Sequence, residues 1–406
     1  MINTISYQEA RDLLMRTARP ADLEEVPLQQ AAGRILGRDL TAGENVPAFD
    51  KSPYDGYAFR AADTAEAGPD HPVTLRVLEE VPAGRMPRER VTAGTAVRIM
   101  TGAPIPEGAD AVCMFEKTDF TGNRVTLFSS FRSGQNVIRA GEDVGKGTLL
   151  ARQGTRIDAG LCGSAAAQNR TGLLCYRIPR VGLLSTGSEL LEVGEASVPG
   201  RIYNSNRYTF AAELSRMGFD VRWLGTAPDS VDEIRALLEE GLRTCDAVLS
   251  TGGVSVGDYD VTAKAMEEAG AGILFRGVSM KPGMACAYGV REGKLVCGLS
   301  GNPASSLINF HVIAAPAFRR IAGWAADRTL PSPFPVALAE GFGKPSPLPR
   351  FLRGRLDLSD GGTRMRLSPD QGNIVLSSSI GMDMIALVPA GSGRLEAGTM
   401  LEGFLI

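Results

Sequence analysis

Three short segments, each rich in glycine and in hydroxyl or carboxyl side chains, have the residue types of an anion-binding site. They are LSTGSELL, with Thr186, Gly187 and Glu189; STGGVSVGDYD, with Gly252, Gly253, Ser255, Asp258 and Asp260; and GLSGNPASS, with Ser300, Gly301, Asn302 and Pro303. Glycine lets the backbone come close to a ligand, and the free N–H groups of a helix start favour negative charge. The segments therefore predict a site for phosphate or another oxyanion.

Carboxylates in the same segments point to a divalent cation. Glu189, Asp258 and Asp260 would repel a bound anion unless a cation lay between them, and Mg²⁺ commonly bridges carboxylates and phosphate in this way. Lys281, in MKPGMACAYG, could add a positive charge to the same site. The expected chemistry is a magnesium-dependent reaction at a phosphate.

Each of these residues also has a purely structural interpretation. Asp229 and Asp260 could be helix N-caps, and Ser230 with Glu233 forms a capping-box pattern. Lys281 could be a solvated surface residue, and the glycine-rich segments match neither the P-loop nor the dinucleotide fingerprint. The coincidence of three such segments favours the functional interpretation.

An alternation of strands and helices brings the three segments to one edge of a sheet. Strands are predicted for the runs VGLLST (181–186), VRWLGTA (221–227), AVLST (247–251), ILFRGVSM (273–280) and KLVCGLS (294–300). Helices are predicted to begin near Ser205, Ser230, Asp260 and Ala304. This pattern is typical of an α/β fold with a doubly wound parallel sheet, in which ligands bind beyond the carboxyl ends of the strands.

The pattern changes elsewhere in the chain and predicts further domains. A capping box of Ser6 and Glu9 begins an amphipathic helix that runs to about Thr17, and short alternating runs typical of strands follow later. After Pro331, FLRGRLDL, RMRLS, NIVLSS and MIALVPA are predicted as strands. We expect a discontinuous N-terminal domain (1–46 and 141–177), an inserted β-rich domain (47–140), an α/β domain (178–326) and a C-terminal β domain (327–406).

Acidic and hydroxyl residues also occur in turns outside the α/β region. Asp55 lies in FDKSPYDGYAF, Thr101 ends a strand-like run in RIMTGAPIPEGADAV, and Glu142 and Asp143 lie between glycines in GEDVGKG. Each segment could be an ordinary turn. Loops that hold such residues between aromatic or glycine neighbours often carry function, however.

Composition excludes several classes of protein. The chain has 406 residues, 44% of them hydrophobic, and a formal net charge of −3, which argues against a disordered chain and against a general nucleic-acid binder. Only His71 and His311 are present, which almost excludes a histidine-based triad or metal site, and we give His311 a packing role. The six scattered cysteines are expected to be reduced core residues, and the lack of a signal sequence or long apolar run predicts a cytoplasmic protein with no membrane contact.

Eight motifs, in order along the whole chain, resemble those of a known family. They are KSPYDGYA, RIMTGAPIPEGADAV, GEDVGKG, LLSTGSEL, RIYNSN, STGGVSVGDYD, MKPG and GLSGNPASS. The chain is similar to the molybdopterin molybdenumtransferases, the family of the MoeA proteins and the gephyrin E domain.

The resemblance implies a fold, a reaction and partners. It implies a homodimer of four-domain subunits with a β-barrel-like C-terminal domain, and an active site shared between the molybdopterin-binding α/β domain of one subunit and the β-rich domain of the other. The reaction would insert molybdate, or tungstate, into adenylylated molybdopterin and release AMP with Mg²⁺. Transient contacts with the upstream adenylyltransferase and with acceptor molybdoenzymes are also implied.

The same resemblance assigns roles to particular residues. The acidic and hydroxyl site residues of the family fall on Asp55, Thr101, Asp143, Glu189, Asp229 and Asp260. Of these, Glu189 and Asp260 would hold Mg²⁺, whereas Asp55 and Thr101 would reach the site across the dimer interface. Lys281 and the amides near Gly252, Gly253 and Asn302 would bind phosphate or molybdate.

The chain departs from the family pattern at two positions. Ser300 stands where the bacterial form often has proline, and Gly277 stands where a basic residue is usual, with Arg276 displaced by one position. The details of anion binding therefore stay open.

Two other functions remain as alternatives. A molybdopterin adenylyltransferase of related fold would make the adenylylated intermediate, but it normally needs only the α/β domain. A non-catalytic scaffold would tolerate loss of Asp55, Glu189 and Asp260, all of which are present.

Overall fold

The computed structural model describes residues 4–254, 261–359 and 362–406, which form two compact units. The first unit comprises residues 1–38, 153–158 and 172–406, and the second comprises residues 39–152 and 159–171. Each unit is described by itself. The boundaries of the four expected domains stay a prediction.

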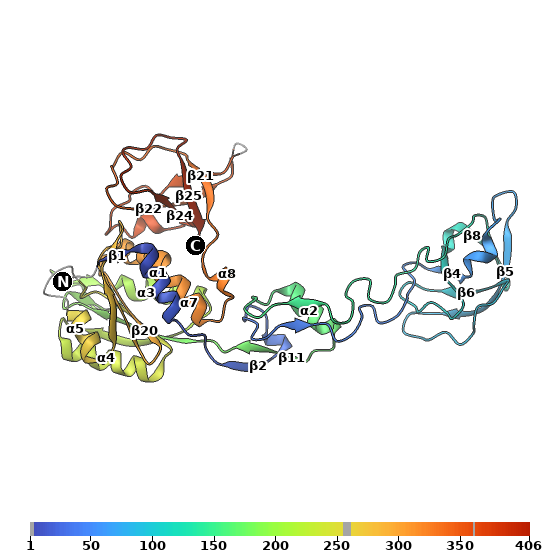
Figure 1. Ribbon diagram of the computed structural model, residues 1–406, viewed down its shortest axis with the longest axis horizontal. Coiled ribbons are helices and arrows are strands. Elements are labelled where there is room, and N and C mark those ends of the chain that lie inside the picture. The colour runs from blue at the N-terminus through green and yellow to red at the C-terminus, as the bar shows by residue number, and fades with distance from the viewer. Residues whose placement is uncertain (1–3, 255–260, 360–361) are drawn as a thin grey trace. The chain divides into compact units, whose positions relative to one another are not determined.

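A six-stranded sheet forms the centre of the first unit (Figure 1). Its strands, in spatial order, are β15 (Asp220–Ala227), β12 (Arg180–Thr186), β16 (Ala247–Thr251), β20 (Lys294–Leu299), β19 (Cys286–Arg291) and β17 (Gly272–Arg276). The helices along this part of the chain are α3 (Ser205–Arg216), α4 (Val231–Thr244), α5 (Val261–Glu268), α6 (Pro303–Asn309), α7 (Ala315–Ile321) and α8 (Ala326–Thr329), with a π-helical turn at Phe310–Ala314. The expected α/β fold is confirmed.

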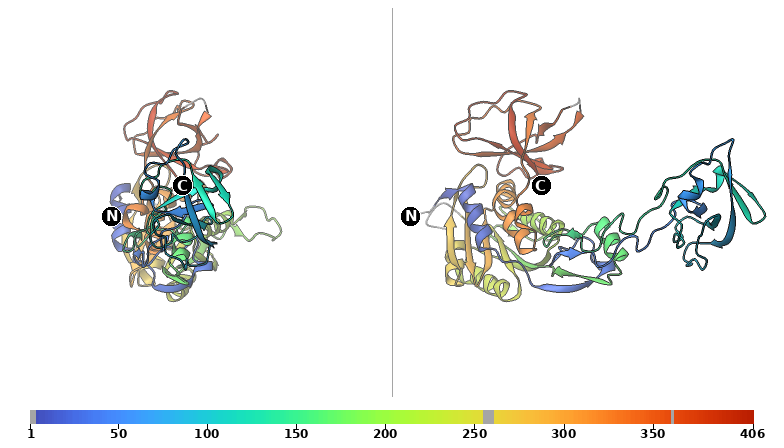
Figure 2. Two further views of the ribbon diagram at one scale, coloured as in Figure 1. Left: turned by 90° about the vertical axis from the view of Figure 1, so that its right-hand side faces the viewer. Right: turned by 45° about the vertical axis from the view of Figure 1, so that its right-hand side comes forward.

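Helices cover both faces of this sheet because its strands are apolar on both faces. On one face, Leu183 of β12 belongs to the same buried cluster as Phe210 and Leu214 of α3. On the other face, Leu184 belongs to a cluster with Ile234 of α4. Figures 1 and 2 show α1 and α7 on the first face and α4 and α5 on the second. Each fully buried leucine contributes about 2 kcal/mol, so the two layers fix where the strands end.

The sheet differs from the expected parallel arrangement at one strand. β12, β15, β16 and β20 pair in parallel, but β19 is antiparallel to both β20 and β17. Its sequence, CAYGVR, follows the MKPG turn closely, so the sequence pattern does not predict it as a separate strand. The run 273–280 is also broken at Gly277, where φ is +79°, into β17 and β18 (Val278–Ser279).

The N-terminal helix forms as its capping box indicates. In α1 (Tyr7–Thr17), the Ser6 side chain accepts a hydrogen bond from the backbone N–H of Glu9, and the Glu9 carboxylate accepts one from the N–H of Ser6. β1 (Ile5–Ser6) pairs with β18, so the start of the chain joins the α/β region. β2 (Leu23–Pro27), followed by a 3₁₀ turn at Leu28–Gln30, pairs with β11 (Gly172–Tyr176).

The C-terminal region closes into a five-stranded barrel, which appears red in Figure 2. Its strands are β21 (Phe334–Leu338), β22 (Arg350–Asp357), β23 (Arg364–Leu367), β24 (Met384–Val388) and β25 (Met400–Leu405). The strand prediction for NIVLSS is wrong, because residues 373–374 form a turn and a 3₁₀ helix follows at Ser377–Ser379. The Arg353 guanidinium bonds the carbonyls of Asp370 and Gly372, which holds this segment out of the barrel.

The second unit contains a separate, mostly antiparallel sheet with its own apolar core. The strand order is β7 (Ala111–Met114), β4 (Gly56–Phe59), β6 (Thr95–Ile99), β5 (Val73–Val81), β9 (Arg124–Leu127) and β8 (Thr118–Thr121). 3₁₀ turns occur at Ala61–Thr64 and Phe115–Lys117, β3 (Leu40–Thr41) pairs with β10 (Leu149–Ala151), and α2 spans Ala159–Ala167. The predicted β-rich character of this region is therefore observed.

Candidate anion-binding site at the strand ends

The loop after β12 folds back tightly on itself. The N–H of Gly187 donates to the carbonyl of Ala227 over 3.0 Å, which ties this loop to the end of β15. Gly187 has φ +145°, and a Cβ placed on it would lie 2.6 Å from a carboxylate oxygen of Glu189. The exposed Glu189 side chain therefore lies directly over the Gly187 backbone.

The loops after β16 and β20 meet the first loop. The N–H of Gly252 donates to the carbonyl of Leu299 over 2.9 Å, and a Cβ on Gly252 would lie 2.1 Å from the carbonyl oxygen of Thr186. A Cβ on Gly301 would lie 3.6 Å from the Cα of Gly252. The three predicted segments therefore come together at the carboxyl ends of β12, β16 and β20, and only glycine fits at their centre.

Several buried polar atoms at this junction have no partner in the described part of the chain. They are the hydroxyl oxygens of Thr186 and Ser250 and the side-chain oxygen of Asn206, whose amide nitrogen donates to the carbonyl of Gly301 over 3.0 Å. A buried polar group without a partner costs about 1–3 kcal/mol. A ligand with donor and acceptor groups would offset this cost, which marks the junction as a binding site.

A buried hydrogen-bond network holds the site from behind. The Ser185 hydroxyl lies 3.1 Å from that of Thr251 and donates to the side-chain oxygen of Asn204 over 3.2 Å. The Asn204 amide reaches Thr226, whose hydroxyl donates to Glu192 over 2.6 Å. Asn204 is 1% exposed and also caps α3. Asn204 lies in the RIYNSN motif, but the network itself could not be predicted, because its members lie far apart along the chain.

Arg207 completes the network at its outer side. Its guanidinium forms an ion pair of 2.5 Å with Glu192 and lies over the ring of Trp223. Burial raises the pKa of Glu192, but hydrogen bonds from Thr226, Arg207 and Asn204 outweigh burial and hold that pKa below its ordinary value. The network is therefore charged at neutral pH.

The barrel contributes a cation that sequence reasoning missed. Arg353 is 0% exposed, donates to Ser378 over 3.1 Å, and has two nitrogens without partners among the described residues. Burial lowers the pKa of its guanidinium. The loop that it holds touches α6, because the N–H of Ser305 donates to the carbonyl of Asn373 over 3.1 Å. A charged residue inside the run FLRGRLDL was the available signal.

Lys281 lies at the same side of the first unit. Its side chain is exposed, its N–H donates to the carbonyl of Pro349, and its carbonyl accepts from Phe351. The backbone of the MKPG turn is thus fixed to the start of β22, whereas the ammonium group is free to move. Lys281 can therefore be either a cation of the anion site or a solvated surface residue, the two interpretations made from the sequence.

The predicted residues Asp55, Thr101 and Asp143 belong to the second unit. One carboxylate oxygen of Asp55 accepts hydrogen bonds from both the N–H and the hydroxyl of Thr101, each over 2.7 Å. These two bonds, the backbone one first, hold the pKa of Asp55 below its ordinary value. Asp143 is exposed in a turn, and its N–H donates to the carbonyl of Val46.

Asp229 is not a helix cap. Ser230 is the N-cap of α4 but makes no side-chain capping bond, so the predicted capping box of Ser230 and Glu233 is wrong. Asp229 instead exchanges weak hydrogen bonds with Ser188, of 3.4 and 3.3 Å. This contact orients its carboxylate toward the loop of Glu189 and leaves α4 to be held by packing.

The donor set suits a hard cation held in part by substrate. Glu189 and Asp229 carry oxygen ligands on neighbouring loops, and neither forms an ion pair with any residue described. Within residues 4–254, 261–359 and 362–406, no group of three or more potential ligands forms a metal site. Mg²⁺ typically takes one or two carboxylates plus phosphate oxygens, so these residues fit it. Ser255, Asp258 and Asp260 lie outside the described residues.

Comparison with known proteins decides the family. Residues 5–168 match the MoeA N-terminal region (domain I and II), and residues 182–320 match a probable molybdopterin binding domain. A molybdopterin molybdenumtransferase of Bacillus subtilis is 36% identical over 410 residues, which cover 99% of this chain and 94% of the relative. The chain belongs to the molybdopterin molybdenumtransferase family. It is therefore an enzyme of molybdenum cofactor biosynthesis.

Other members of the molybdopterin molybdenumtransferase family agree with this assignment. The Staphylococcus epidermidis enzyme is 31% identical and covers 99% of this chain and 95% of its own length. The molybdopterin biosynthesis MoeA protein of Pyrococcus horikoshii has a TM-score of 0.85 at 29% identity and covers 99% of both chains. The resemblance drawn from eight sequence motifs is confirmed.

The two departures from the family pattern have local explanations. Gly277 adopts φ +79° between β17 and β18, a conformation that favours glycine over a basic residue. The Ser300 hydroxyl accepts a hydrogen bond from the N–H of Asn302 over 3.2 Å, which shapes the turn before α6.

Other expectations from composition have clear outcomes. The six cysteines, all in the described part of the chain, form no disulfide; five of them are buried, and Cys162 is half-buried. His311 is 4% exposed within the π-helical turn, in agreement with its packing role. No helix in the described part of the chain is long and apolar enough to cross a membrane.

Proposed function

We propose that this enzyme inserts molybdate, or tungstate, into adenylylated molybdopterin in a Mg²⁺-dependent reaction that releases AMP. The observation that carries the proposal is the junction of three glycine loops lined by unpartnered hydroxyls of Thr186 and Ser250. Such a junction suits a ligand with several phosphate or oxo groups, because backbone N–H groups and hydroxyls can surround each anion. Family membership supports adenylylated molybdopterin as this ligand.

Some residues of the junction would bind the substrate, and others would bind Mg²⁺. Thr186, Ser250 and Asn206 would hydrogen-bond the substrate, and the amides near Gly252 and Asn302 would hold its phosphates. Glu189 and Asp229, with Asp260 from the adjoining segment, would hold Mg²⁺. Bound Mg²⁺ would neutralise charge on the phosphates and on the departing AMP.

A cation would hold the second anion. Lys281 has an exposed ammonium group on a fixed turn, and Arg353 has unused donors beside the loop that touches α6. The exposed Lys281 is suited to a tetrahedral oxyanion such as molybdate or tungstate, whereas Arg353, which is 0% exposed, would position the loop that touches α6. Molybdate and tungstate have nearly the same size and charge, so the site would accept either oxyanion.

The remaining predicted residues fit a shared active site. Asp55 is held in a defined orientation by Thr101, as a residue that acts on a ligand requires. In a homodimer, Asp55, Thr101 and Asp143 of one subunit would complete the site of the other. The upstream adenylyltransferase and the acceptor molybdoenzymes would then exchange intermediates with this cleft.

Release of AMP tests the proposal. Purified enzyme would be mixed with adenylylated molybdopterin and Mg²⁺, with molybdate, tungstate or neither. We expect oxyanion-dependent AMP release that stops with a chelator and falls about 100-fold or more in Asp229→Asn and Asp260→Ala. Glu239→Gln is the control, because this exposed carboxylate lies about two turns along α4 from the helix start that adjoins the glycine loops. No release under any condition would overturn the proposal and favour a scaffold.

A further inference from the structure

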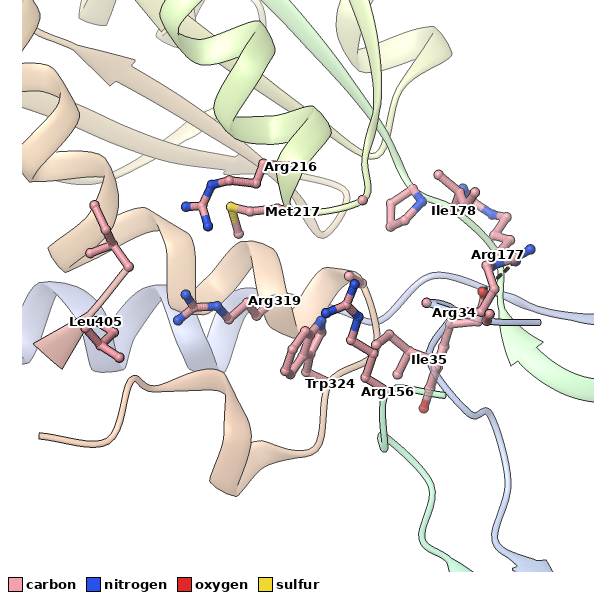
Figure 3. A pocket seen from close by; sticks show the side chains of 17 residues that line it. Arg34, Ile35, Arg156, Arg177, Ile178, Arg216, Met217, Arg319, Trp324 and Leu405 are labelled. Atoms are coloured by element: carbon pink, nitrogen blue, oxygen red, sulfur yellow. Dashed lines mark hydrogen bonds between the residues drawn. The ribbon is translucent and has the colours of Figure 1, made fainter. Parts of the chain in front are cut away.

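A cavity of about 500 Å³ lies at the opposite edge of the same sheet (Figure 3). It is lined by Pro179, which precedes β12, and by Met217 and Gly218, which precede β15. The glycine loops follow the other ends of these strands. A strand of seven residues such as β12 spans about 20 Å, so the cavity is separate from the site described above.

Five arginines line this cavity, and two of them are neutralised. Arg34 forms an ion pair with Glu24, and Arg177 forms two short hydrogen bonds with Asp246, of 2.7 and 2.5 Å. The second pair joins the end of β11 to the start of β16. Both pairs have a structural role and contribute little net charge to the cavity.

Of the other three arginines, Arg216 alone forms an ion pair with a residue that the structure describes. Arg216 forms an ion pair of 2.8 Å with Glu213, whereas Arg319 donates only to the carbonyl of Thr329, over 3.1 Å. Arg156 forms no ion pair with any side chain in the described ranges. Figure 3 shows the guanidinium groups of Arg216 and Arg319 extending in the same direction. The cavity therefore holds positive charge that side-chain carboxylates do not balance.

Besides burial, the excess positive charge lowers the pKa values of neighbouring basic groups. Burial lowers the pKa of Arg319, and the charge of Arg216 lowers it further. The charges of Arg216 and Arg319 also lower the pKa of the nearby His311, in addition to burial and against the opposite effect of Glu213. An anion in the cavity would relieve the repulsion among these cations.

The rest of the lining is apolar and includes a large aromatic ring. Trp324 lies beside Arg156, and Ile35, Met217 and Leu405 extend the apolar surface (Figure 3). Pockets of roughly 300–1,000 Å³ with apolar walls and a few convergent polar groups are typical of small-molecule sites. Guanidinium groups bind phosphate through paired hydrogen bonds, and indole rings stack on planar rings.

We propose that this cavity binds a small phosphate ester with a planar ring, of the class of nucleoside monophosphates. Arg216 and Arg319 hold the phosphate, and Trp324, with Arg156 beside it, packs against the ring (Figure 3). The site is distinct from the strand-end site, and its occupant does not depend on the reaction proposed there.

Binding of AMP to the full-length protein tests this proposal. Calorimetric titrations would use AMP, adenosine and inorganic phosphate as separate probes, with folding of each variant checked by thermal melting. We expect Arg216→Gln to weaken AMP binding about tenfold, the typical effect of losing one charge-assisted hydrogen bond. Trp324→Leu should weaken AMP binding but not phosphate binding. Arg328→Gln, which removes an exposed arginine outside the cavity, is the matched control.

A variant of the strand-end site separates the two sites. Glu189→Gln should leave the component of AMP binding that depends on Arg216 unchanged. AMP binding that is insensitive to Arg216→Gln, or that is lost only in Glu189→Gln, would overturn the proposal. Inorganic phosphate binding as tightly as AMP would also overturn it, because the ring would then have no role.

Discussion

At the scale of the residue, the strand-end site depends on backbone that no side chain can replace. Gly252 has φ +94° and Gly253 has φ +63°, and a Cβ on either would lie within 3 Å of Thr186. The glycines therefore bring three loops together and leave hydroxyls facing the junction. This is why glycine-rich segments could be selected from the sequence as candidates.

Replacing Gly252 tests this role of the backbone. Gly252→Ala should destabilise the protein by at least about 3 kcal/mol, because strain in the left-handed region adds to a clash with the Thr186 carbonyl. AMP release should fall with it. Gly200→Ala is the control, since Gly200 has φ +81° with nothing within 4 Å, and its cost should be about 1 kcal/mol. Equal losses of thermal stability in the two variants would contradict this interpretation.

The pairing of Asp55 with Thr101 makes a prediction about pH. Thr101→Val removes the hydroxyl bond, so the pKa of Asp55 should rise toward its ordinary value. A depressed carboxylate pKa stabilises the fold above the ordinary pKa, and this contribution disappears as pH falls through the folded-state value. The variant should therefore lose part of that contribution. Carboxyl NMR titration would measure the shift, with Asp50 as an internal control because its partners are Ala140 and Arg139.

Not every residue of the site could be found from the sequence. Thr186 and Glu189 lie in a glycine loop and carry their own signal, whereas Ser250 lies within a buried strand and Asn206 within a helix. Arg353 reaches the α6 side only because β22 places it on the same face as Phe351, which packs against the α/β core. Such neighbours are set by tertiary packing, which one sequence does not reveal.

At the scale of the element, strand ends are positioned by caps and by buried hydrogen bonds. α3 and α4 offer a direct comparison, because both begin next to the site. Asn204 caps α3 through its side chain and joins the network behind the loops, whereas Ser230 begins α4 without a side-chain bond. The first cap therefore couples helix and site, and the second does not.

This difference predicts unequal effects of the same substitution. Asn204→Ala should cost about 2–4 kcal/mol, because it removes a cap and leaves the buried Ser185 and Thr226 short of a partner. Ser230→Ala should cost less than about 0.5 kcal/mol. Denaturant unfolding would measure both values, and AMP release should fall only in the first variant. A larger effect for Ser230→Ala would contradict the role given to the network.

Elements were predictable where their apolar pattern was continuous and bounded by turns. β12, β16 and β20 are of this kind, and so is the Ser6 capping box of α1. β19 follows the MKPG turn too closely to be seen, and NIVLSS is apolar without being a strand. In both segments, contacts with neighbouring parts of the chain decide the backbone conformation and outweigh the preference of the local sequence.

At the scale of the whole molecule, the α/β sheet has unlike chemistry at its two edges. The carboxyl ends carry glycine loops with Glu189 and Asp229, and the amino ends adjoin the arginine-lined cavity. His311, which is buried near Glu213, Arg216 and Arg319, has a pKa lowered to about 4, first by burial. Its protonation is therefore linked to global stability.

The sign of this linkage gives a prediction. The unfolded state binds a proton at His311 below pH 6.5, whereas the folded state does not until about pH 4, so stability is present above pH 6.5 and lost as pH falls. This group alone should remove about 2 kcal/mol between pH 7.5 and pH 5. His311→Gln should reduce the acid sensitivity of urea unfolding by that amount, whereas His71→Gln, at an exposed position, is the control. An unchanged pH dependence in His311→Gln would contradict the linkage.

The central claim is that molybdenum insertion and AMP release occur together at the strand-end site. A single turnover with adenylylated molybdopterin, Mg²⁺ and molybdate would measure AMP released and molybdenum bound by the dithiolene in the same sample. We expect equal amounts of the two products, and loss of both in Glu189→Gln. AMP released at the same rate without any oxyanion, with no molybdenum incorporated when molybdate is present, would contradict the claim.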